Sequence, residues 1–593
     1  MTSAAVLLEY RDRIGQIEAA VAHLQMRQGT TAAVMALALV TAGTFFFLAF
    51  SRRAMPVWYP PLPLIAAVVA FRKYRRQRSE ISHSLRLRRF YVRGLERLEE
   101  HWAGNGISGE EFQARGHIYA ADLNVFGSGS LFERLCTART HLGCERLAYY
   151  LQEPVSPEEI RRRQASVREL AERSDLREKL TLLGRRDFEE SRRQTFTAWL
   201  DSAPTGFAPW LRPAALTSSV VLSVLSLAVL LSPSTWPVLV PAILPIAAVN
   251  AAAGLWLRTR VRSVLKAAAP VASESALIRE GLELLAGERF VAPKLAALTT
   301  CVGAAGAALR RLQPWLTILE NRTKDWFYAP FLWLLLGTQT ALAIESWRLR
   351  HGNTLRQWLD AWAEFEALNS LACYAHENPE DCWAKLDETG TTFRAEGLGH
   401  PLLARDACVR NDVSIGEAYR FCVLSGSNMS GKSTLLRSIG LAAVLAFAGA
   451  PVRARSLHLG VMRICASISI ADSLREGKSK FLAEVERLRQ TLEFSAAGPV
   501  LFLVDEIFSG TNSPDRQAAA DAVARTLSAR GAIGAISTHD IALAAIAAHG
   551  GANLHMGSRE GTENPLDFDY ILKPGVTTES NALAIARMAG VPV

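Results

Sequence analysis

A glycine-rich stretch, residues 421–434, contains the residue types that hold phosphate groups. It reads FCVLSGSNMSGKST, in which an apolar run leads into a turn with the pattern G-x-x-x-x-G-K-[ST]. Glycines allow backbone N–H groups to curl around one anion, and the following helix adds its positive end. We expect Lys432 to reach the β- and γ-phosphates of ATP and the Ser433 hydroxyl to ligate Mg²⁺. The nucleotide-binding residues are predicted to be Gly426, Ser427, Asn428, Met429, Ser430, Gly431, Lys432, Ser433 and Thr434.

Two later apolar runs end in side chains that suit the same site. Residues 500–506 read VLFLVDE, which is typical of a buried parallel strand. Because ligands of such sheets bind beyond the carboxyl ends of the strands, we expect Asp505 beside Mg²⁺ and Glu506 beside the γ-phosphate. Glu506 is then the candidate general base for the attacking water, and Lys432 assists catalysis from the phosphate side. A third run, AIGAIS, leads to T-H-D, whose His539 is a candidate to stabilise the γ-phosphate.

Each of these stretches could also occur by chance without forming a nucleotide site. A glycine turn can precede a helix without binding anything, and two acids at a strand end can be merely exposed. A histidine after a strand is also unremarkable by itself. The occurrence of strand, loop and helix in one stretch, with two further strands ending in suitable residues, favours a nucleotide site.

The composition describes a large, basic chain. With 593 residues the chain is too long for one hydrophobic core, which indicates several domains. Its formal net charge of +9 and its pI of about 9.2 suit an anionic partner, either nucleic acid or the inner face of a membrane. The eight cysteines form no C-x-x-C pair, so we expect reduced thiols and no structural metal cluster. No cleavable signal peptide is expected before the first apolar run.

Uncharged stretches predict membrane-spanning helices. Residues 31–50, about twenty in number, are long enough to cross a bilayer, and they follow an amphipathic helix over residues 5–27. Residues 55–71 are expected to form the returning arm of a hairpin. Residues 213–257 also lack charge and have room for two more spans. A very apolar soluble hairpin is the alternative for this last segment.

Basic residues flank these stretches and predict their orientation. The sequences RKYRRQR (72–78) and RLRRFYVR (86–93) are expected on the cytoplasmic side, against anionic lipid headgroups. A solvated helix face and a nucleic-acid contact are the alternatives. We therefore predict a multi-pass protein of a bacterial-type inner membrane with its ATPase in the cytoplasm. The uncharged run 326–344 is expected to be a buried core helix, because one further span would place the ATPase outside.

Taken together, the motifs resemble those of the DNA mismatch-repair MutS family. GSNMSGKST is similar to the GPNMGGKST-type loop of that family, and LFLVDEIFSGTNSPD is similar to its Walker B stretch and the loop that follows. GKSKFLAEV resembles its S-T-F-x-x-E signature through Ser479, Phe481 and Glu484, with Lys480 in place of threonine. The final YILKPGVTTESNALAIARMAGVP also resembles the family pattern. The resemblance covers roughly residues 118–200 and 270–593.

The resemblance implies a fold class and a division of the chain. The fold class is an α/β P-loop ATPase domain of ABC-like type joined to an all-α MutS-like core, with transmembrane helical hairpins. Residues 1–110 would hold the amphipathic helix, the first hairpin and the basic helix. Residues 111–212 and 258–395 would form the two parts of the helical core, separated by the second hairpin at 213–257. Residues 396–593 would form the ATPase domain.

The resemblance also implies partners. A homodimer with composite ATP sites would place Ser479 of one subunit against the nucleotide held by Lys432 of the other. Mismatched or branched DNA would be bound, and ATP hydrolysis would open and close helical arms around it. The departures weaken the DNA expectation: no N-terminal mismatch-reading domain is expected, and the 213–257 hairpin occupies the place of the family's levers and DNA clamp.

Two other functions stay open at this point. An ABC-type transporter ATPase would carry more spans and an L-S-G-G-Q signature, neither of which is evident. An ATP-switched membrane scaffold without a DNA role would share every motif described above. A measurement of ATP hydrolysis is needed to distinguish such a scaffold from an enzyme.

Overall fold

The computed structural model describes residues 2–51, 56, 59, 61–184, 188, 192–232, 236–322, 335–388, 390–469, 480–509, 511–559 and 567–577. The chain divides into two compact units. Unit 1 comprises Met1–Cys136, Tyr150–Leu182 and Leu371–Val593, and unit 2 comprises Thr137–Tyr149 and Leu183–Ser370. The predicted mixture of an α/β part with a large helical part is confirmed.

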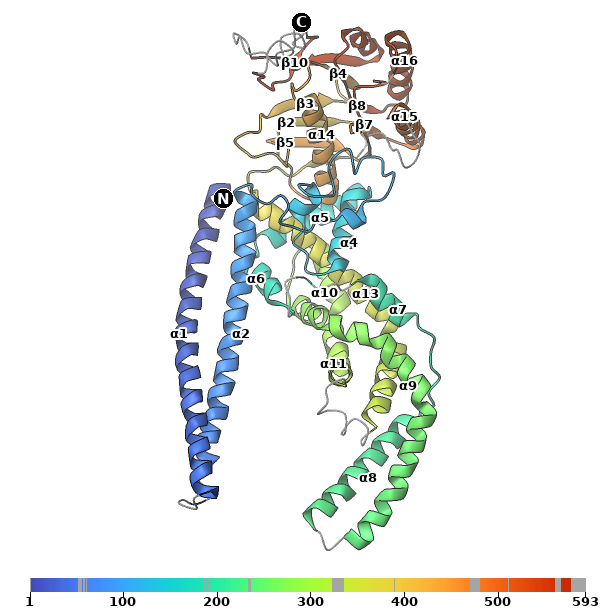
Figure 1. The fold of residues 1–593 in the computed structure, drawn as a ribbon. Coiled ribbons are helices and arrows are strands. Elements are labelled where there is room, and N and C mark those ends of the chain that lie inside the picture. The colour runs from blue at the N-terminus through green and yellow to red at the C-terminus, as the bar shows by residue number, and fades with distance from the viewer. Residues whose placement is uncertain are drawn as a thin grey trace. The chain divides into compact units, whose positions relative to one another are not determined.

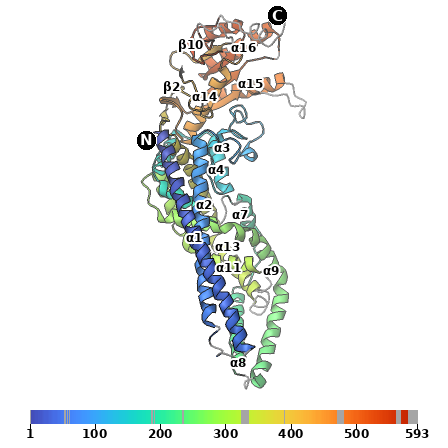
Figure 2. The same cartoon turned by 60° about the vertical axis from the view of Figure 1, so that its left-hand side comes forward.

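Unit 1 begins with two long helices, α1 (Ser3–Phe50) and α2 (Pro61–Leu98), which lie antiparallel, side by side (Figures 1 and 2). Near the N-terminus they share a small core of Val6, Tyr10 and Tyr91. The predicted amphipathic segment and the apolar segment after it are one continuous helix, because the chain between them contains no proline to interrupt it.

Buried polar contacts attach this helical pair to the rest of unit 1. The Tyr91 hydroxyl donates a hydrogen bond to Glu178, and Arg97 pairs with Glu377 at 2.6 Å, where both side chains are largely buried. The nearby short elements are η1 (Glu110–Phe112), α3 (Leu131–Leu135), α5 (Pro157–Ala171) and α6 (Ser174–Leu182). Helix α4 (His141–Gln152) is divided between the two units.

The C-terminal part of unit 1 contains two sheets. The four-stranded sheet has the order β1-β5-β2-β3, from β1 (Lys385–Asp387), β5 (Ser456–Gly460), β2 (Phe393–Leu398) and β3 (Asn411–Ile415). The six-stranded sheet has the order β10-β9-β4-β8-β7-β6, from β10 (Lys573–Pro574), β9 (Gly551–His555), β4 (Phe421–Ser425), β8 (Ile533–Thr538), β7 (Val500–Asp505) and β6 (Arg463–Ser467).

Helices cover both faces of the six-stranded sheet, whose strands are parallel except for β10. Phe502 and Val504 of β7 pack into a core with residues of α15 (Lys480–Ala497), α16 (Ser513–Ala529) and η3 (Ile541–His549). The alternate residue Leu503 points to the other face, against α14 (Lys432–Ala448), where Gly440 leaves room for it. Burial on both faces explains why the strands read as continuous apolar runs.

The regular elements in the described residues of unit 2 are helices, joined by loops. Its helices are α7 (Arg193–Leu200), α8 (Leu211–Leu231), α9 (Trp236–Gly287), α10 (Pro293–Val302), α11 (Ala305–Asn321) and α13 (Leu336–Glu377), the last of which continues into unit 1. Of the uncharged run 326–344, residues 326–334 lie outside the described residues. The remainder is in α13, where residues 341–344 are buried.

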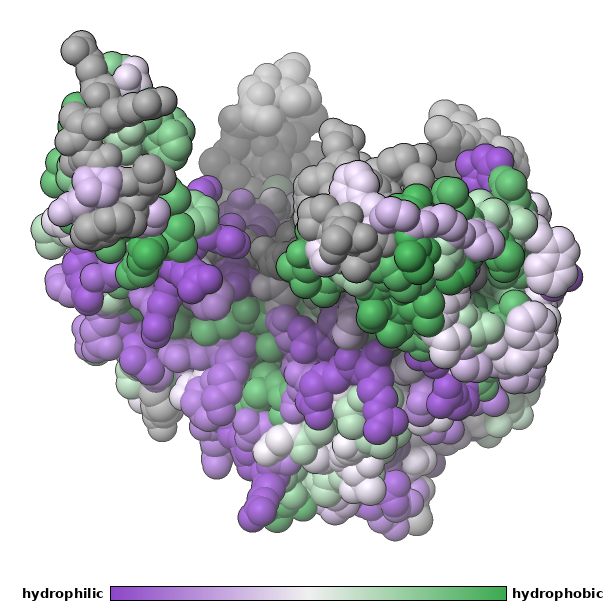
Figure 3. Space-filling model, turned by 90° about the horizontal axis from the view of Figure 1, so that it is seen from below, coloured by the Kyte–Doolittle hydropathy of each residue, from purple (hydrophilic) through white to green (hydrophobic). Residues whose placement is uncertain are grey.

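Among the residues that the structure describes, three helices are long and apolar enough to cross a membrane by length and composition: α1, α8 and Trp236–Ala272 of α9. Helix α2 is not among them, because its apolar start at residues 61–71 runs directly into the basic segment. Figure 3 shows hydrophobic side chains gathered on the α1–α2 pair and on the α8–α9 pair. Exposed large apolar side chains on these helices include Val34, Leu37, Val40, Phe46, Phe47 and Phe50 of α1 and Val220, Val224, Leu227, Leu230, Leu231, Trp236, Val238, Leu244 and Val249 of α8 and α9.

A buried carboxyl group in unit 2 predicts a pH-dependent stability. Glu366 of α13 accepts hydrogen bonds from the Thr140 hydroxyl and, at 2.9 Å, from the Arg139 N–H. Burial nevertheless raises its pKa from 4.5 to about 7. Between these values the folded chain retains a proton that the unfolded chain has released. Unit 2 should therefore be most stable below pH 4.5 with respect to this group and lose about 3 kcal/mol as the pH rises through 7.

Amide hydrogen exchange of residues 137–149, measured from pH 5 to pH 8 and corrected for intrinsic rates, measures this loss. Glu366→Gln should abolish the pH dependence, whereas the control Asp360→Asn, at a half-exposed ion pair with Arg193, should retain it. An identical pH profile in wild type and Glu366→Gln would contradict the assignment.

Candidate functional site

The glycine-rich loop joins β4 to α14 at the carboxyl edge of the six-stranded sheet. Gly431 precedes α14 with a φ of 99°, a left-handed conformation that favours glycine. A Cβ atom at Gly426 would lie 2.5 Å from the Met556 carbonyl oxygen, so only glycine lets the loop approach the end of β9 this closely. The strand, loop and helix predicted from the sequence are therefore present.

Asp505 lies at the centre of the site. One carboxylate oxygen accepts a hydrogen bond from Ser433 Oγ at 2.5 Å, and the other accepts one from Ser537 Oγ. Asp505 is paired with Ser537 in the register of β7 and β8, and Ser433 arrives from the start of α14. The two residues predicted as ligands of Mg²⁺ are thus in direct contact. A hydroxyl and a carboxylate oxygen are ligands that Mg²⁺ prefers.

Glu506 and His539 also lie together. The Nδ1 atom of His539 is 3.1 Å from Glu506 Oε1, and both side chains are partly exposed. Glu506 has a φ of 54°, a left-handed conformation that is strained for a residue with a side chain, and its N–H donates to the Ser537 carbonyl oxygen at 3.1 Å. This turn keeps the carboxylate at the end of β7 while it directs the chain away from the sheet.

A cavity of about 450 Å³ opens beside these residues. Of the predicted nucleotide-binding residues, those that line it are Asn428, Met429, Gly431, Lys432, Ser433 and Thr434, and Glu506 lines it as well. Gly426, Ser427 and Ser430 belong to the same loop without lining the cavity, and neither Asp505 nor His539 is in its wall. Ser479 lies outside the described residues.

The loop contains polar groups that suit a phosphate. Lys432 is 5% exposed, and its Nζ donates to the carbonyl oxygens of Gly426 and Ser427, both at 2.8 Å. An ammonium group has three donors, so one remains for an anion. Burial lowers the pKa of Lys432, and the negative charges of Glu506 and Asp505 oppose this shift. Within the described residues, the buried Ser430 Oγ has no hydrogen-bond partner. A phosphate oxygen would accept the remaining donor of Lys432, which lines the cavity, so the residues fit the ligand.

The structure adds residues that the sequence reasoning missed. Ser537 could have been found only from the pairing of β8 with β7. Glu484, noted solely as a motif match, accepts a hydrogen bond from the Phe508 N–H and so connects α15 to the turn after Glu506. The remaining cavity wall includes His400, whose pKa burial and nearby arginines lower to about 4, so that the ring is neutral at pH 7. The other new wall residues are Leu398, Leu403, Ala407, Cys408, Val409, Asn411, Leu435, Ser438, Met556 and Tyr570.

These features define a class of site: a glycine-rich loop whose groups suit a phosphate, with a carboxylate and hydroxyl pair at the carboxyl edge of a parallel sheet. Comparison with known proteins agrees with this location. Residues 422–593 match the family described as MutS domain V. The DNA mismatch repair protein MutS 2 of Halobacterium salinarum is 31% identical over 279 residues, which cover 46% of this chain and 31% of that protein.

The DNA mismatch repair protein MSH6 of Arabidopsis thaliana is 33% identical over 269 residues, which cover 41% of this chain and 20% of that protein. The C-terminal part of this chain is therefore similar to proteins of the MutS family, and residues 422–593 match one of its domains. The chain spans less than a third of the length of either relative. Neither comparison supports the transporter alternative.

Proposed function

We propose that this chain is a membrane-anchored MutS-type ATPase that couples ATP binding and hydrolysis to a conformational change. The observation that carries the proposal is the contact of Ser433 with Asp505 beside the loop that contains Lys432. These side chains come from two separate stretches of sequence, residues 421–434 and 500–506, and meet at one edge of a sheet. The match to MutS domain V begins at residue 422 and supports the same assignment.

The roles of the residues follow from their positions. Lys432 and the N–H groups of residues 426–434 bind the phosphates, while Ser433 and Asp505 would hold Mg²⁺. Mg²⁺, when bound, neutralises phosphate charge and orients the terminal group. Glu506 accepts the proton of the attacking water, and His539, at 3.1 Å, orients the Glu506 carboxylate. A dimer with composite sites, in which Ser479 of a second copy contacts the nucleotide, remains part of the proposal.

Substitution of Glu506 separates binding from turnover. Glu506→Gln should retain MgATP binding and lower the hydrolysis rate by about 10²–10⁴-fold, because the base is lost while the phosphate contacts remain. Lys432→Ala should abolish binding. Phosphate release and calorimetric titration of the full chain in nanodiscs measure the two properties.

The control is Glu493→Gln, which removes an exposed carboxylate paired with Arg489 on α15 and should change neither property. If wild type hydrolyses ATP no faster than Glu506→Gln, the chain is an ATP-switched scaffold and the enzyme proposal is wrong.

DNA is the proposed partner of the conformational change, on the basis of the relatives, both of which are named as DNA mismatch repair proteins. The net charge of +9 also suits a polyanion. Affinity for duplex, mismatched and branched DNA should fall steeply between about 50 and 200 mM salt, as expected when phosphates are neutralised. Fluorescence anisotropy with and without MgATP measures this. Absence of salt-dependent binding to all three would remove DNA from the proposed function.

The membrane proposal rests on the exposed apolar surfaces of α1, α8 and α9, with anionic lipid headgroups as the partner of residues 72–78. Exposed patches of this extent mark a membrane or protein interface. In intact bacterial cells, an impermeant maleimide should label Leu231→Cys, at the end of α8, but should label Arg262→Cys only after permeabilisation. Chain with its native cysteines alone is the control. Labelling of both positions from one side would contradict the topology.

A further inference from the structure

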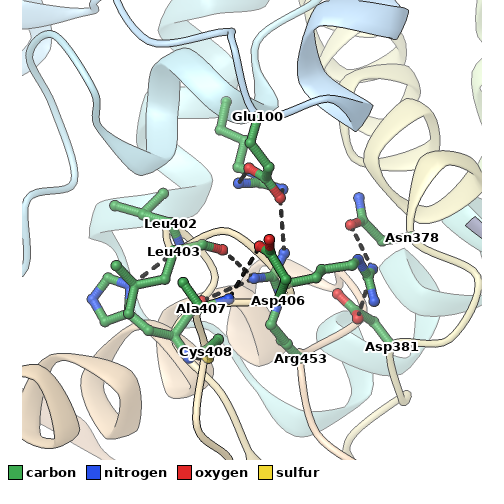
Figure 4. A network of polar contacts seen from close by, with 12 residues as sticks. Glu100, Asn378, Asp381, Leu402, Leu403, Asp406, Ala407, Cys408 and Arg453 are labelled. Atoms are coloured by element: carbon green, nitrogen blue, oxygen red, sulfur yellow. Dashed lines mark hydrogen bonds and ion pairs between the residues drawn. The ribbon is translucent and has the colours of Figure 1, made fainter.

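Glu100 lies in the turn directly after α2 and faces two buried arginines (Figure 4). Its carboxylate accepts two hydrogen bonds from Arg134, at 2.8 and 3.2 Å, and one from Trp102 Nε1 at 3.2 Å. It also lies 3.7 Å from Nη2 of Arg453. Glu100 has a φ of 60°, a left-handed conformation that aims its side chain into this cluster. One carboxylate therefore balances two buried guanidinium groups.

Arg453 connects this carboxylate to the wall of the nucleotide cavity. Its Nη1 atom donates to the carbonyl oxygens of His400 and Leu403, and both of these residues line the cavity. Its own carbonyl oxygen accepts from the Gly399 N–H at 2.8 Å. Arg453 is 1% exposed, so it cannot exchange these partners for bulk water. Arg453 thus contacts residues 399–403 through both its guanidinium and its backbone carbonyl.

The hydrogen bonding of Arg453 is incomplete. Among the described residues, its Nε and Nη2 atoms have no hydrogen-bond partner. Glu100 compensates the charge at 3.7 Å but is too far away for a hydrogen bond. An approach of about 0.5–1 Å would create that bond. A small displacement of the turn after α2 therefore changes how firmly Arg453 is held.

A parallel connection involves α1. Arg405, in the same loop, pairs with Glu380 at 3.1 Å and with Asp381 at 3.3 Å, and it donates to Asn378 at 2.8 Å. Glu380 in turn accepts from the Ser3 N–H, at the first residue of α1, at 3.4 Å. Figure 4 shows Asn378 and Asp381 on one side of this network and Glu100 on another. The loop that lines the cavity is thus attached to both helices of the pair.

We propose that the α1–α2 helical pair regulates the nucleotide site through Glu100 and Arg453. The inference rests on the proposed nucleotide function and adds a control element to it. Glu100 and Arg453 are positioning residues, since neither lines the cavity. When Glu100 approaches Arg453, the carbonyl groups of His400 and Leu403 are held in place and the cavity wall is fixed. When it withdraws, the wall relaxes and nucleotide affinity falls. Reciprocally, bound nucleotide must stabilise the turn after α2, because coupling between two sites is mutual.

The test uses the full chain in nanodiscs with MgADP as the probe. In wild type, MgADP should slow amide hydrogen exchange both in residues 399–409 and in residues 95–102, where the Glu99 and His101 N–H groups are bonded to Leu95 and Glu96. Glu100→Gln should weaken MgADP binding by about 5-fold or more and abolish the protection at 95–102. The matched control is Glu99→Gln, one residue earlier, whose carboxylate pairs with Arg11 at 2.7 Å and should change neither result.

The outcomes are distinguishable. If wild type binds MgADP but exchange at 95–102 is unchanged, or if Glu100→Gln binds as tightly as wild type, the regulatory inference is wrong and the nucleotide function stands. If wild type does not bind MgADP at all, the proposed function itself fails. The wild-type exchange experiment decides the question even if Glu100→Gln does not fold.

Discussion

The site depends on one constraint, that parallel strands end at the same edge of a sheet. β4, β8 and β7 are adjacent, so the loop after β4 and the acids at the end of β7 lie close together. Asp505 makes use of this convergence, since its two oxygens accept from hydroxyl groups on either side. Hydrogen bonds to a carboxylate are stronger than those between neutral groups, so the three residues fix one another. The packed core fixes the strands, and the register of the strands fixes Asp505 beside Ser537.

Sequence patterns predicted the parts of the site that local geometry determines. A glycine turn between a strand and a helix has few conformations, and the loop around Lys432 adopts the expected one. Residues whose position depends on neighbouring strands were not predictable in the same way. Ser537 acts through its pairing with Asp505, and Glu484 acts through a backbone group in another stretch. His400 and Arg453 belong to a loop and a strand connection that carry no periodic signal, so only the fold reveals them.

The helical regions illustrate a second limit of sequence patterns. Uncharged length predicted apolar helices at residues 31–50 and 213–257, and the structure has apolar helices at both. The boundaries differ for a physical reason. A helix ends where a residue interrupts it, and a change from amphipathic to apolar composition does not interrupt a helix. α1 therefore continues from Ser3 to Phe50, and α2 continues from its apolar start through the basic segment to Leu98.

The continuity of α2 bears on the regulation proposed for the α1–α2 pair. Because α2 is a single helix up to Leu98, no loop separates its apolar end from the turn that holds Glu100. The buried pair of Arg97 with Glu377 attaches the end of α2 to α13. Arg453 would respond to a displacement of Glu100 because, among the described residues, its buried Nε and Nη2 donors have no hydrogen-bond partner and would gain more from an approaching carboxylate than exposed donors would. The affinity of a nucleotide site usually depends on the residues that contact the nucleotide. In the regulation proposed above, a second input would come from Glu100, which does not line the cavity.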